Sequence, residues 1–398
     1  MFEVFPETPL FGANLITQQF KADPRNDKID LGLGVYRDDA GLTPVMAAVK
    51  KAEARLLRDQ TSKSYVGLAG DAGFCDALAA LVLGQGPAIN DWTCVQTPGG
   101  VAALRLAIEM IAQANPSAKV WASSPSWANH GPIMRAGGLE VVEFRFLDAA
   151  TQTLDATGML ADLETASPGD VVLLQACCHN PTGIEMPPAH WDQVAEVLAR
   201  RGLLPILDVA YQGFGQGLEE DVYGVRAIAA QVPEALMAVT CSKTFSNYRD
   251  RSGILGAMTR AADQFPRVRQ KMLSCVNTLY AMPPDHGAVV VKLILTDEAL
   301  RAQWLAELDV MRDRVQTCRR QLAEALRQAT NGDAFDFLTQ HRGMFSLLPL
   351  SPEQVKRLRA EHGVYILPDG RMNLAGLTGD HIEQVARAIA KVMRDVPR

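Results

Sequence analysis

The chain has 398 residues, a formal net charge of −6 and 48% hydrophobic residues, which is enough length and apolar content for a large core and two domains. The acidic balance argues against a nucleic-acid-binding protein, which usually carries a basic excess. No apolar run reaches membrane-spanning length and the N-terminus lacks the features of a signal peptide, so we expect a cytoplasmic protein with no membrane partner.

The seven cysteines are scattered along the chain and odd in number. Cys177 and Cys178 are adjacent in an apolar run that predicts a strand, where neighbouring side chains point to opposite faces, so we expect no disulfide between them. The cysteines are typical of core residues in a reducing compartment. Neither their spacing nor that of the seven histidines matches a metal site, and we expect no metal.

The N-terminal segment is apolar, with Phe2, Val4 and Phe5 near its start. An arm of this kind either docks on a partner subunit or folds onto its own chain. Residues 29–36 then predict a strand that enters a glycine-rich turn, where Gly34 lets the backbone approach a ligand. Two glycines with no helix close behind them match a dinucleotide-binding fingerprint poorly. Helices are predicted at about 44–58 and 74–83, with a loop that contains Tyr65 between them.

Gly99 and Gly100 precede a helix that is predicted to run to about residue 114. Free backbone N–H groups and the helix dipole at such a start favour an anion. Strands and helices alternate from there on, which is typical of a mainly parallel sheet covered on both faces. The predicted strands are 119–122, 141–144, 171–178, 203–211, 235–239 and 254–258, with a helix at 188–201.

Polar side chains come after successive strands of this predicted sheet: Trp127, Asn180, Asp208 with Tyr211, and Lys243. The carboxyl edge of an open parallel sheet is where ligands bind. Asp208 closes a run of five apolar residues, and a buried carboxylate is costly unless a cation pairs with it. A pyridinium nitrogen would be such a cation, and an aspartate that caps a loop is the alternative.

Lys243 lies just past the apolar run 235–239, between Ser242 and Thr244. Partial desolvation disfavours an ammonium ion, so the amine becomes a nucleophile near neutral pH. Arg251, eight residues further on, has the charged fork that suits a phosphate. An amine that forms an imine beside a phosphate site is what pyridoxal phosphate requires. The alternative is an ordinary solvated lysine.

The C-terminal part predicts one long helix followed by a smaller α+β region. We expect Thr296 to cap the helix, with acids in its first turn and an apolar face that includes Leu300 and Trp304. The predicted organisation is an N-terminal arm at 1–12, part of a small domain at 13–43, a large cofactor-binding domain at 44–297, and an interdomain helix with the small domain at 298–398.

Together these residues resemble the class I pyridoxal-phosphate aminotransferases of the aspartate/aromatic amino-acid subgroup, over essentially the whole chain. The most specific pieces are Asn180-Pro181-Thr182-Gly183, Asp208-Val209-Ala210-Tyr211-Gln212-Gly213-Phe214, and Ser242-Lys243-Thr244-Phe245 with Arg251. The resemblance implies an α/β protein of fold type I. Its large domain has a mostly parallel mixed sheet covered by helices, its smaller domain is α+β, and it forms a homodimer with shared active sites in which the arm is an intersubunit clasp.

The resemblance also implies roles for the catalytic residues Lys243, Asp208 and Tyr211. Lys243 holds pyridoxal 5′-phosphate as an imine and moves the proton between the substrate α-carbon and the cofactor. Asp208 keeps the pyridine nitrogen protonated, so that the ring absorbs the carbanion's electrons. Asn180 and Tyr211 donate to the phenolic oxygen of the ring, and Trp127 stacks on it.

The remaining implied contacts concern the phosphate and the substrate. The phosphate cradle is matched by Gly99, Gly100, Ser242 and Arg251, and by Tyr65 reaching in from the neighbouring subunit. Arg371 matches the arginine that grips the substrate α-carboxylate. The implied substrate-binding residues are Gly34, Trp127, Asn180, Arg371 and Asn277.

Four positions depart from the family pattern. Val101 stands where a hydroxyl residue usually contacts the phosphate, Gln175 replaces a frequent histidine beneath the ring, and Met282 replaces a polar residue near the substrate. Counting back from the Pro283-Pro284-Asp285-His286-Gly287 segment places Asn277 where the family's second arginine binds a side-chain carboxylate. An asparagine cannot form the bidentate, charge-assisted pair that an arginine forms with a carboxylate. Loss of such a pair costs about 2–5 kcal/mol.

We therefore expect a pyridoxal-phosphate-dependent aminotransferase that moves an amino group between an L-amino acid and a 2-oxo acid in ping-pong half-reactions. Asn277 and Met282 favour aromatic or other uncharged amino acids. Aspartate with 2-oxoglutarate is the alternative, because Arg267, Arg269 or Lys271 could supply the missing charge. A lyase or decarboxylase of the same fold is more remote. The physiological amino donor, acceptor and pathway stay open.

Overall fold

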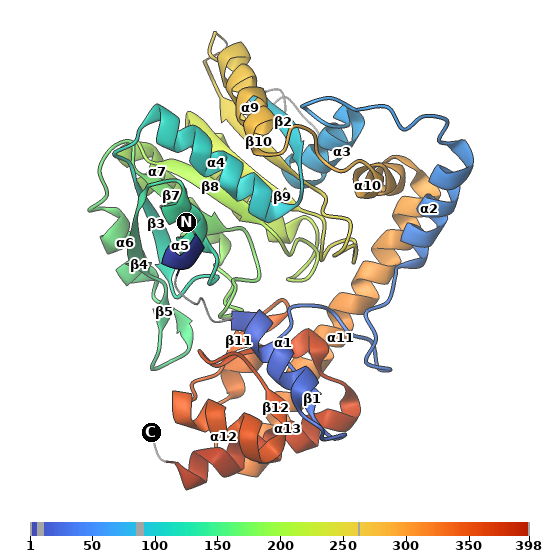
Figure 1. The fold of residues 1–398 in the computed structure, drawn as a ribbon. Coiled ribbons are helices and arrows are strands. Elements are labelled where there is room, and N and C mark those ends of the chain that lie inside the picture. The colour runs from blue at the N-terminus through green and yellow to red at the C-terminus, as the bar shows by residue number, and fades with distance from the viewer. Residues whose placement is uncertain (1, 6–11, 85–90, 262, 397–398) are drawn as a thin grey trace. The chain divides into compact units, whose positions relative to one another are not determined.

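The computed structural model describes residues 2–5, 12–84, 91–261 and 263–396, and it divides into two compact units (Figure 1). The larger unit contains residues 44–180 and 184–313, and the smaller unit contains residues 1–43, 181–183 and 314–398. One boundary falls inside helix α11 (Glu298–Thr330), between Asp313 and Arg314. Of the predicted N-terminal arm, residues 1 and 6–11 lie outside the described residues.

The larger unit is built on one seven-stranded sheet. Its strands are β2 (Trp92–Thr97), β3 (Lys119–Ser124), β4 (Glu140–Arg145), β7 (Val171–Gln175), β8 (Leu204–Val209), β9 (Glu234–Thr240) and β10 (Gly253–Thr259). The spatial order is β2-β10-β9-β8-β7-β3-β4. β10 is antiparallel to both neighbours, and the other strands share one direction. The predicted mostly parallel mixed sheet is confirmed.

The central strands are near-continuous apolar runs because helices cover both faces of the sheet. All seven residues of β10 and five of the six in β8 are buried. The helices of this unit are α2 (Ala47–Asp59), α3 (Ala72–Leu83), α4 (Gly100–Ala114), α5 (His130–Ala136), α6 (Ala156–Leu163), α7 (Pro188–Arg201), α8 (Tyr223–Gln231), α9 (Phe265–Leu279) and α10 (His286–Thr296), with a 3-10 turn at Glu220–Val222 and a short hairpin of β5 (Leu147–Asp148) and β6 (Thr153–Leu154).

Helix α4 lies over one face of the sheet in Figure 1. Its buried residues, such as Leu104 and Ile108, form one apolar core with residues of α9 and of six strands of the sheet. Elsewhere in this unit α7 and α8 pack closely, because Gly224 of α8 leaves room for the ring of Trp191. A helix on the sheet positions its first turn at the carboxyl edge of the strand that precedes it.

The smaller unit is α+β. Its elements are the 3-10 turn Phe2–Val4, α1 (Gly12–Ala22), β1 (Ile29–Asp30), the 3-10 turn Asp336–Thr339, β11 (Phe345–Leu347), α12 (Pro352–His362), β12 (Val364–Tyr365), β13 (Arg371–Asn373), the 3-10 turn Leu374–Gly376 and α13 (Gly379–Asp395). β1 pairs in parallel with β12, and β11 pairs antiparallel with β13. The apolar face of α13 packs with the C-terminal half of α11 on these strands.

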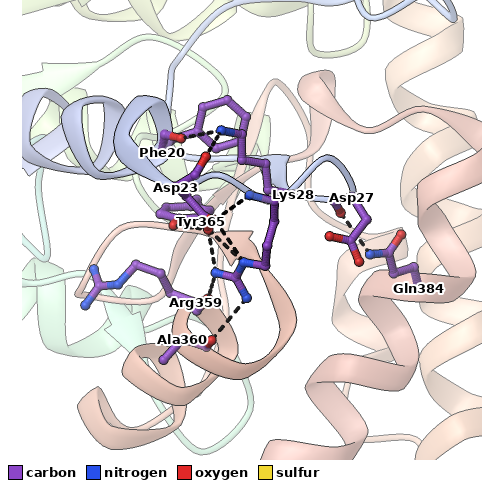
Figure 2. A network of polar contacts seen from close by, with 9 residues as sticks. Phe20, Asp23, Asp27, Lys28, Arg359, Ala360, Tyr365 and Gln384 are labelled. Atoms are coloured by element: carbon purple, nitrogen blue, oxygen red, sulfur yellow. Dashed lines mark hydrogen bonds and ion pairs between the residues drawn. The ribbon is translucent and has the colours of Figure 1, made fainter.

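A polar network joins the segment after α1 to β12 and the end of α12 (Figure 2). The Tyr365 hydroxyl donates to Asp23 Oδ2 at 2.6 Å, and the ring of Tyr365 packs edge-on against Phe20. Arg25 donates to Asp23 and to the carbonyl oxygens at residues 359 and 360. Lys28 donates to the carbonyl oxygens of Phe20 and Asp23. The network therefore holds together segments about 340 residues apart in sequence.

We expect Asp23→Asn to destabilise the smaller unit at neutral pH and to weaken its response to acid. Hydrogen bonds from Arg25 and then from Tyr365 hold the pKa of Asp23 well below its ordinary value of 3.8. A lowered pKa in the folded state gives stability above the ordinary value that is lost as the pH falls through the folded value. Denaturant unfolding at a series of pH values should show the wild-type advantage shrinking below about pH 4.

The control for this prediction is Asp27→Asn in the same segment, because Asp27 contacts Gln384 through its backbone oxygen. That variant should behave like the wild type at every pH. An advantage of the wild type over Asp23→Asn that stays constant down to pH 3 would contradict the assigned role of the ionised carboxylate.

Three predicted features differ from the structure. Asp297, rather than Thr296, accepts the N–H groups at the start of α11, because its carboxylate bonds to the residues two and three positions on, while Thr296 ends α10. The strand predicted at 29–36 stops at Asp30, whose carboxylate turns the chain by accepting the Gly32 N–H. Cys177 and Cys178 lie beyond the end of β7 and do not alternate on a strand, although both are free thiols.

None of the described helices combines the length and the apolar character that a membrane-spanning helix needs.

Candidate active site

The strand directions of the larger unit bring the predicted site residues to one edge of the sheet. β2, β3, β7, β8 and β9 all end at this edge, and β10 begins there because Gly253 pairs with both Thr97 and Thr240. Arg251, two residues before β10, therefore lies at the same edge as Lys243, which comes after β9. The structure brings these residues together around a cavity of about 160 Å³.

The cavity is lined mainly by residues from the ends of these strands and from the first turn of α4. The lining residues are Gly100, Val101, Leu104, Trp127, Gln175, Asn180, Asp208, Ala210, Tyr211, Thr240, Ser242, Lys243 and Arg251. Nine of them are predicted site residues. Asp208 is the one acid among these described lining residues, so the opposite end of the cavity is free to accept a negative charge.

The positive end of the cavity is formed by Arg251 and the start of α4. Arg251 Nη1 donates to Ser242 Oγ at 3.1 Å, and Thr240 Oγ1 donates to the same hydroxyl at 3.3 Å. Gly99 precedes the helix with φ +78°, and a Cβ atom there would lie 2.6 Å from Arg251 Nη2. Since the first N–H groups of a helix have no partner within it, this end presents backbone and side-chain donors to an anion.

Lys243 follows β9, which lies in the sheet between β10, preceded by Arg251, and β8, which carries Asp208. Its side chain is half-buried, and its Nζ lies 5.0 Å from the centre of the Tyr211 ring. The indole N–H of Trp304 donates to the carbonyl oxygen of Thr244, and the Trp304 ring stacks on Phe245. Trp304 of α11 thus fixes the backbone of the turn that carries the lysine.

Asp208 is buried and held by a histidine. Its Oδ2 lies 3.1 Å from His130 Nε2, and His130 Nδ1 lies 2.8 Å from the Ser126 hydroxyl. His130 itself is fully buried and meets Trp127 edge-on. A histidine that bonds to a carboxylate through one nitrogen and to a hydroxyl through the other has its ring orientation fixed. This orientation in turn fixes the carboxylate, which lines the cavity.

Asn180 and Tyr211 place two donors side by side. Asn180 Nδ2 lies 3.3 Å from the Tyr211 hydroxyl, and both residues are buried. Asn180 comes after β7 and Tyr211 after β8, which are adjacent parallel strands. The two groups face the cavity from the side of the sheet that also carries Gln175 and Asp208, whose backbones are in register.

Three predicted residues of the larger unit do not line the cavity: Gly99, which precedes the lining residue Gly100, and two others. Tyr65 is 88% exposed, and Asn277 is exposed near the end of α9. Met282, three residues past α9, accepts the Val66 N–H on its sulfur at 3.2 Å. The loop that carries Tyr65 and the segment after α9 therefore meet on one exposed surface of this chain.

Gly34 and Arg371 belong to the smaller unit, where they share one neighbour. The Arg371 guanidinium lies 4.5 Å from the centre of the Phe345 ring, and a Cβ atom on Gly34 would lie 2.9 Å from Phe345 Cζ. Asn373 Nδ2 donates to the carbonyl oxygens of Leu33 and Val35, which fixes the segment around Gly34. The structure thus brings Gly34 and Arg371 together on the ring of Phe345.

Several residues of these sites were not predicted, and three of them make contacts described above. His130 is the first residue of α5 and follows a polar segment, where a single histidine carries no signal of a buried partner. Thr240 ends an apolar strand and is a common strand residue. Phe345 is indistinguishable by sequence from a core aromatic residue. The one sequence signal was position, since Thr240 lies three residues before Lys243 and His130 three after Trp127.

Another cavity, of about 540 Å³, lies at the amino ends of β8 and β9. Its lining is mostly apolar and includes Arg267 and Lys271 of α9. Lys271 donates to Gln113. The lining contains neither a carboxylate held by a histidine nor a cluster of hydroxyl donors, so the smaller cavity around Lys243 is the candidate active site.

Cys177, Cys178 and Asp221 form a buried group whose ligand atoms lie within 4.8 Å of one another. Both oxygens of Asp221 accept backbone N–H groups, from Gly213 and Gly215 on one side and from residues 216 and 217 on the other. Burial raises the pKa of Asp221 and raises the pKa of the Cys178 thiol well above its ordinary value. The group therefore has a structural explanation as the anchor of the loop after Tyr211.

The fold of the larger unit and the residues that line this cavity are those of one class of enzymes, the aminotransferases. The chain belongs to the family of class I and class II aminotransferases, whose model matches residues 26–389.

Among named relatives, the chain is 46% identical to the aromatic-amino-acid aminotransferase of Paracoccus denitrificans over 374 residues, which cover 94% of this chain and 95% of the relative. It is 42% identical to the aspartate aminotransferase of Escherichia coli over 391 residues, 98% of both chains. The crystal structure of the aromatic-amino-acid aminotransferase of Burkholderia pseudomallei, covalently bound to pyridoxal phosphate, matches with a TM-score of 0.95 at 38% identity, covering 98% of this chain and 99% of that one.

Proposed function

We propose that the chain is a pyridoxal-phosphate-dependent aminotransferase that acts on aromatic or other uncharged amino acids with a 2-oxo acid as acceptor. The observation that carries the proposal is the single cavity that holds Lys243 between a cluster of phosphate-type donors and the His130-held Asp208. Family membership and the covalently bound pyridoxal phosphate of the Burkholderia relative support it.

The cavity's chemistry fits this cofactor at both ends. Arg251, with the Ser242 and Thr240 hydroxyls and the N–H groups at the start of α4, suits a phosphate. Asp208 at the other end suits a protonated ring nitrogen, which would satisfy a buried carboxylate. Val101 leaves the cradle without the hydroxyl that the family pattern has at that position, so the phosphate relies more on the side chains after β9.

Each residue then has a task that its place determines. When bound, pyridoxal phosphate supplies an electron sink that stabilises the carbanion formed at the substrate α-carbon. Lys243 would hold the cofactor covalently, and its amine would move the α-proton as general base and acid. Asp208 would hold a proton at the ring nitrogen, and Asn180 and Tyr211 would donate to the phenolic oxygen. Trp127 would pack on the ring and exclude water.

The substrate α-carboxylate is assigned to Arg371 of the smaller unit. Its guanidinium is almost fully buried and stacks on Phe345, which keeps the planar fork in one orientation. An arginine held in this way suits bidentate binding of a carboxylate. Gly34, whose missing side chain leaves space at the same ring, is the second residue of the smaller unit that we assign to the substrate.

We propose a homodimer in which each subunit contributes to the other's active site. The residues assigned to the neighbouring site are exposed in the single chain: Tyr65 is 88% exposed, and Phe2, Val4 and Phe5 of the arm are 77%, 79% and 67% exposed. Neighbouring exposed apolar side chains, such as those of the arm, favour a surface that a partner covers. The cytoplasm is the proposed location, on the grounds of composition.

The substrate preference rests on the segment from Asn277 to Met282. Asparagine is uncharged, and Met282, which lies against the loop of Tyr65, has an apolar side chain. The three basic residues that could replace the lost arginine are placed elsewhere in the larger unit. Arg267 and Lys271 line the cavity at the amino ends of the strands, and Arg269 donates to Thr93. This arrangement favours uncharged side chains over aspartate.

A half-reaction panel tests the proposal. The pyridoxal form of the protein is mixed with phenylalanine, tyrosine, aspartate, glutamate and alanine, and the change in cofactor absorbance is monitored by stopped flow. We expect the aromatic amino acids to react fastest and the corresponding 2-oxo acids to appear. Aspartate reacting fastest would support the alternative, an aspartate aminotransferase. Carbon dioxide or another cleavage product without a 2-oxo acid would support a lyase or decarboxylase.

We expect Asn277→Arg to raise kcat/KM for aspartate and glutamate by about 30-fold or more, since a charge-assisted pair with a carboxylate contributes about 2–5 kcal/mol. The value for phenylalanine should change little, because its ring gains no such pair. Steady-state kinetics with both substrates measures the two effects. Asn277→Lys is the matched control, since it restores a charge but not the bidentate geometry and should gain less.

A further inference from the structure

We propose that Gln175 is a positioning residue that holds Asn180 in place for the bound cofactor. The inference rests on the proposed function and goes beyond it, because it assigns a task to a residue that departs from the family pattern. Gln175 is the last residue of β7 and lines the cavity. It touches Asn180 through the backbone of that residue.

Two hydrogen bonds join the side-chain amide of Gln175 to Asn180. Gln175 Nε2 donates to the Asn180 carbonyl oxygen at 2.9 Å, and the Asn180 N–H donates to Gln175 Oε1 at 2.9 Å. Only one orientation of the amide makes both bonds, since turning it over would set donor against donor and acceptor against acceptor. The side-chain amide therefore forms hydrogen bonds with both the N–H and the carbonyl oxygen of Asn180, as the backbone of a neighbouring strand would.

No other side chain at position 175 makes this pair of bonds equally well. A glutamate has no N–H to donate, and a neutral histidine presents only one nitrogen at a time in a given direction. An apolar residue would leave two polar backbone groups without these partners in a buried place, at a cost of about 1–3 kcal/mol for each. The family's histidine is thus replaced here by the residue that closes this five-residue loop.

The position of Asn180 in the chain explains why these two hydrogen bonds are needed to hold it in place. Asn180 is the last residue of the larger unit before residues 181–183, which belong to the smaller unit. Gly183 packs closely within the smaller unit, since a Cβ atom there would collide with the carbonyl oxygen of Phe345. The two bonds from β7 tie Asn180 to the edge of the sheet that carries Asp208 and Tyr211, so its side chain keeps its register with them.

The side chain of Asn180 is the group that faces the chemistry. Its Nδ2 lies 3.3 Å from the Tyr211 hydroxyl, and the proposed function assigns both as donors to the phenolic oxygen of the cofactor. A donor to that oxygen stabilises its deprotonated form and so lowers the pKa of the proton that the oxygen shares with the Lys243 nitrogen. A displaced Asn180 donor raises that pKa.

The test is a spectroscopic titration of the protein with bound cofactor, comparing the wild type with Gln175→Met. Methionine has a similar length and volume but makes neither bond. We expect the pKa read from cofactor absorbance against pH to rise by about 0.5–1 unit. Asn180→Ala, which removes the donor outright, should shift it in the same direction by at least as much.

The double variant Gln175→Met with Asn180→Ala decides whether the effect passes through Asn180. If it does, the double variant titrates like Asn180→Ala alone, because there is no donor left to position. Additive shifts would overturn the proposal, and so would a Gln175→Met titration that matches the wild type. A general loss of stability from a core defect would not by itself move this pKa.

Gln175→Asn covers the case in which Gln175→Met does not fold. This variant keeps the amide, but its side chain is one methylene too short to reach the Asn180 backbone. The same rise in the cofactor pKa is therefore expected. An unchanged pKa overturns the proposal. Failure of the proposed function is distinct, since the wild type would then show no cofactor absorbance to titrate.

Discussion

Replacement of Lys243 by alanine should lower the rate of amino-group transfer by at least about 10⁴-fold. The variant loses the only nucleophilic amine among the described residues that line the cavity, and with it both the covalent link to the cofactor and the group that moves the α-proton. General acid–base catalysis alone contributes about 10²–10⁴-fold, and nucleophilic catalysis adds to it. Single-turnover kinetics with phenylalanine measures the loss.

The same variant has a structural readout. Borohydride treatment of the wild type with pyridoxal phosphate should fix a label at Lys243, as mass spectrometry of the digested protein would show, and the variant should take no label there. Lys271→Ala is the matched control, since Lys271 belongs to the same unit and bonds to Gln113 away from this cavity. A wild type that stays colourless with pyridoxal phosphate would contradict the whole assignment.

Asp208→Asn should lower kcat/KM for the amino-acid half-reaction by about 10²–10³-fold. The carboxylate is buried and bonds to His130, so it can stabilise a proton on the ring nitrogen in a place that water does not screen. Removing one partner of such a buried charge pair costs about 2–5 kcal/mol. An asparagine keeps the shape of the side chain but leaves the ring nitrogen without its counter-charge, so the electron sink weakens.

Asp170→Asn is the control for a buried aspartate on the same sheet. Asp170 accepts from the Trp121 indole and from two backbone N–H groups, just before β7 begins. Its replacement should lower thermal stability and leave the cofactor spectrum and the half-reaction rate unchanged. If Asp208→Asn kept the full rate while Asp170→Asn lost it, the chemistry would have to be assigned to the other edge of the sheet.

Much of the larger unit could be predicted from the order of its apolar runs. Strands that are buried on both faces have continuous apolar sequences, and the residues just past the ends of parallel strands lie at a common edge of the sheet. That is why Asn180, Asp208 and Lys243 could be placed together without coordinates. Arg251 was harder, because its position depends on β10 running in the opposite direction.

The contacts between distant segments could not be predicted in this way. The bond between His130 and Asp208 joins residues 78 positions apart, and nothing local to either residue indicates it. Residues 181–183 belong to the smaller unit although the chain on both sides belongs to the larger one. This assignment depends on packing against a strand more than 150 residues away. Periodicity and turn signals describe neighbours in sequence and carry no such information.

Local competition explains the smaller differences. Thr296 and Asp297 are both good N-cap residues. The carboxylate of Asp297 accepts the N–H groups at the start of α11 at 3.0 Å. The Thr296 hydroxyl instead donates to the Lys292 carbonyl oxygen within α10. A threonine inside a helix commonly bonds in this way. Residues 31–36 looked like a strand, but only Ile29 and Asp30 have strand partners on β12.

The carboxylate of Asp221 has a practical consequence for anyone who wishes to redesign this protein. Because it gathers the N–H groups of the loop 213–217 onto its two oxygens, a mutant library that varied this loop would mostly return misfolded clones. In the segment from Asn277 to Met282, four of the six residues are exposed. Diversity introduced there is the economical route to variants with new substrate ranges.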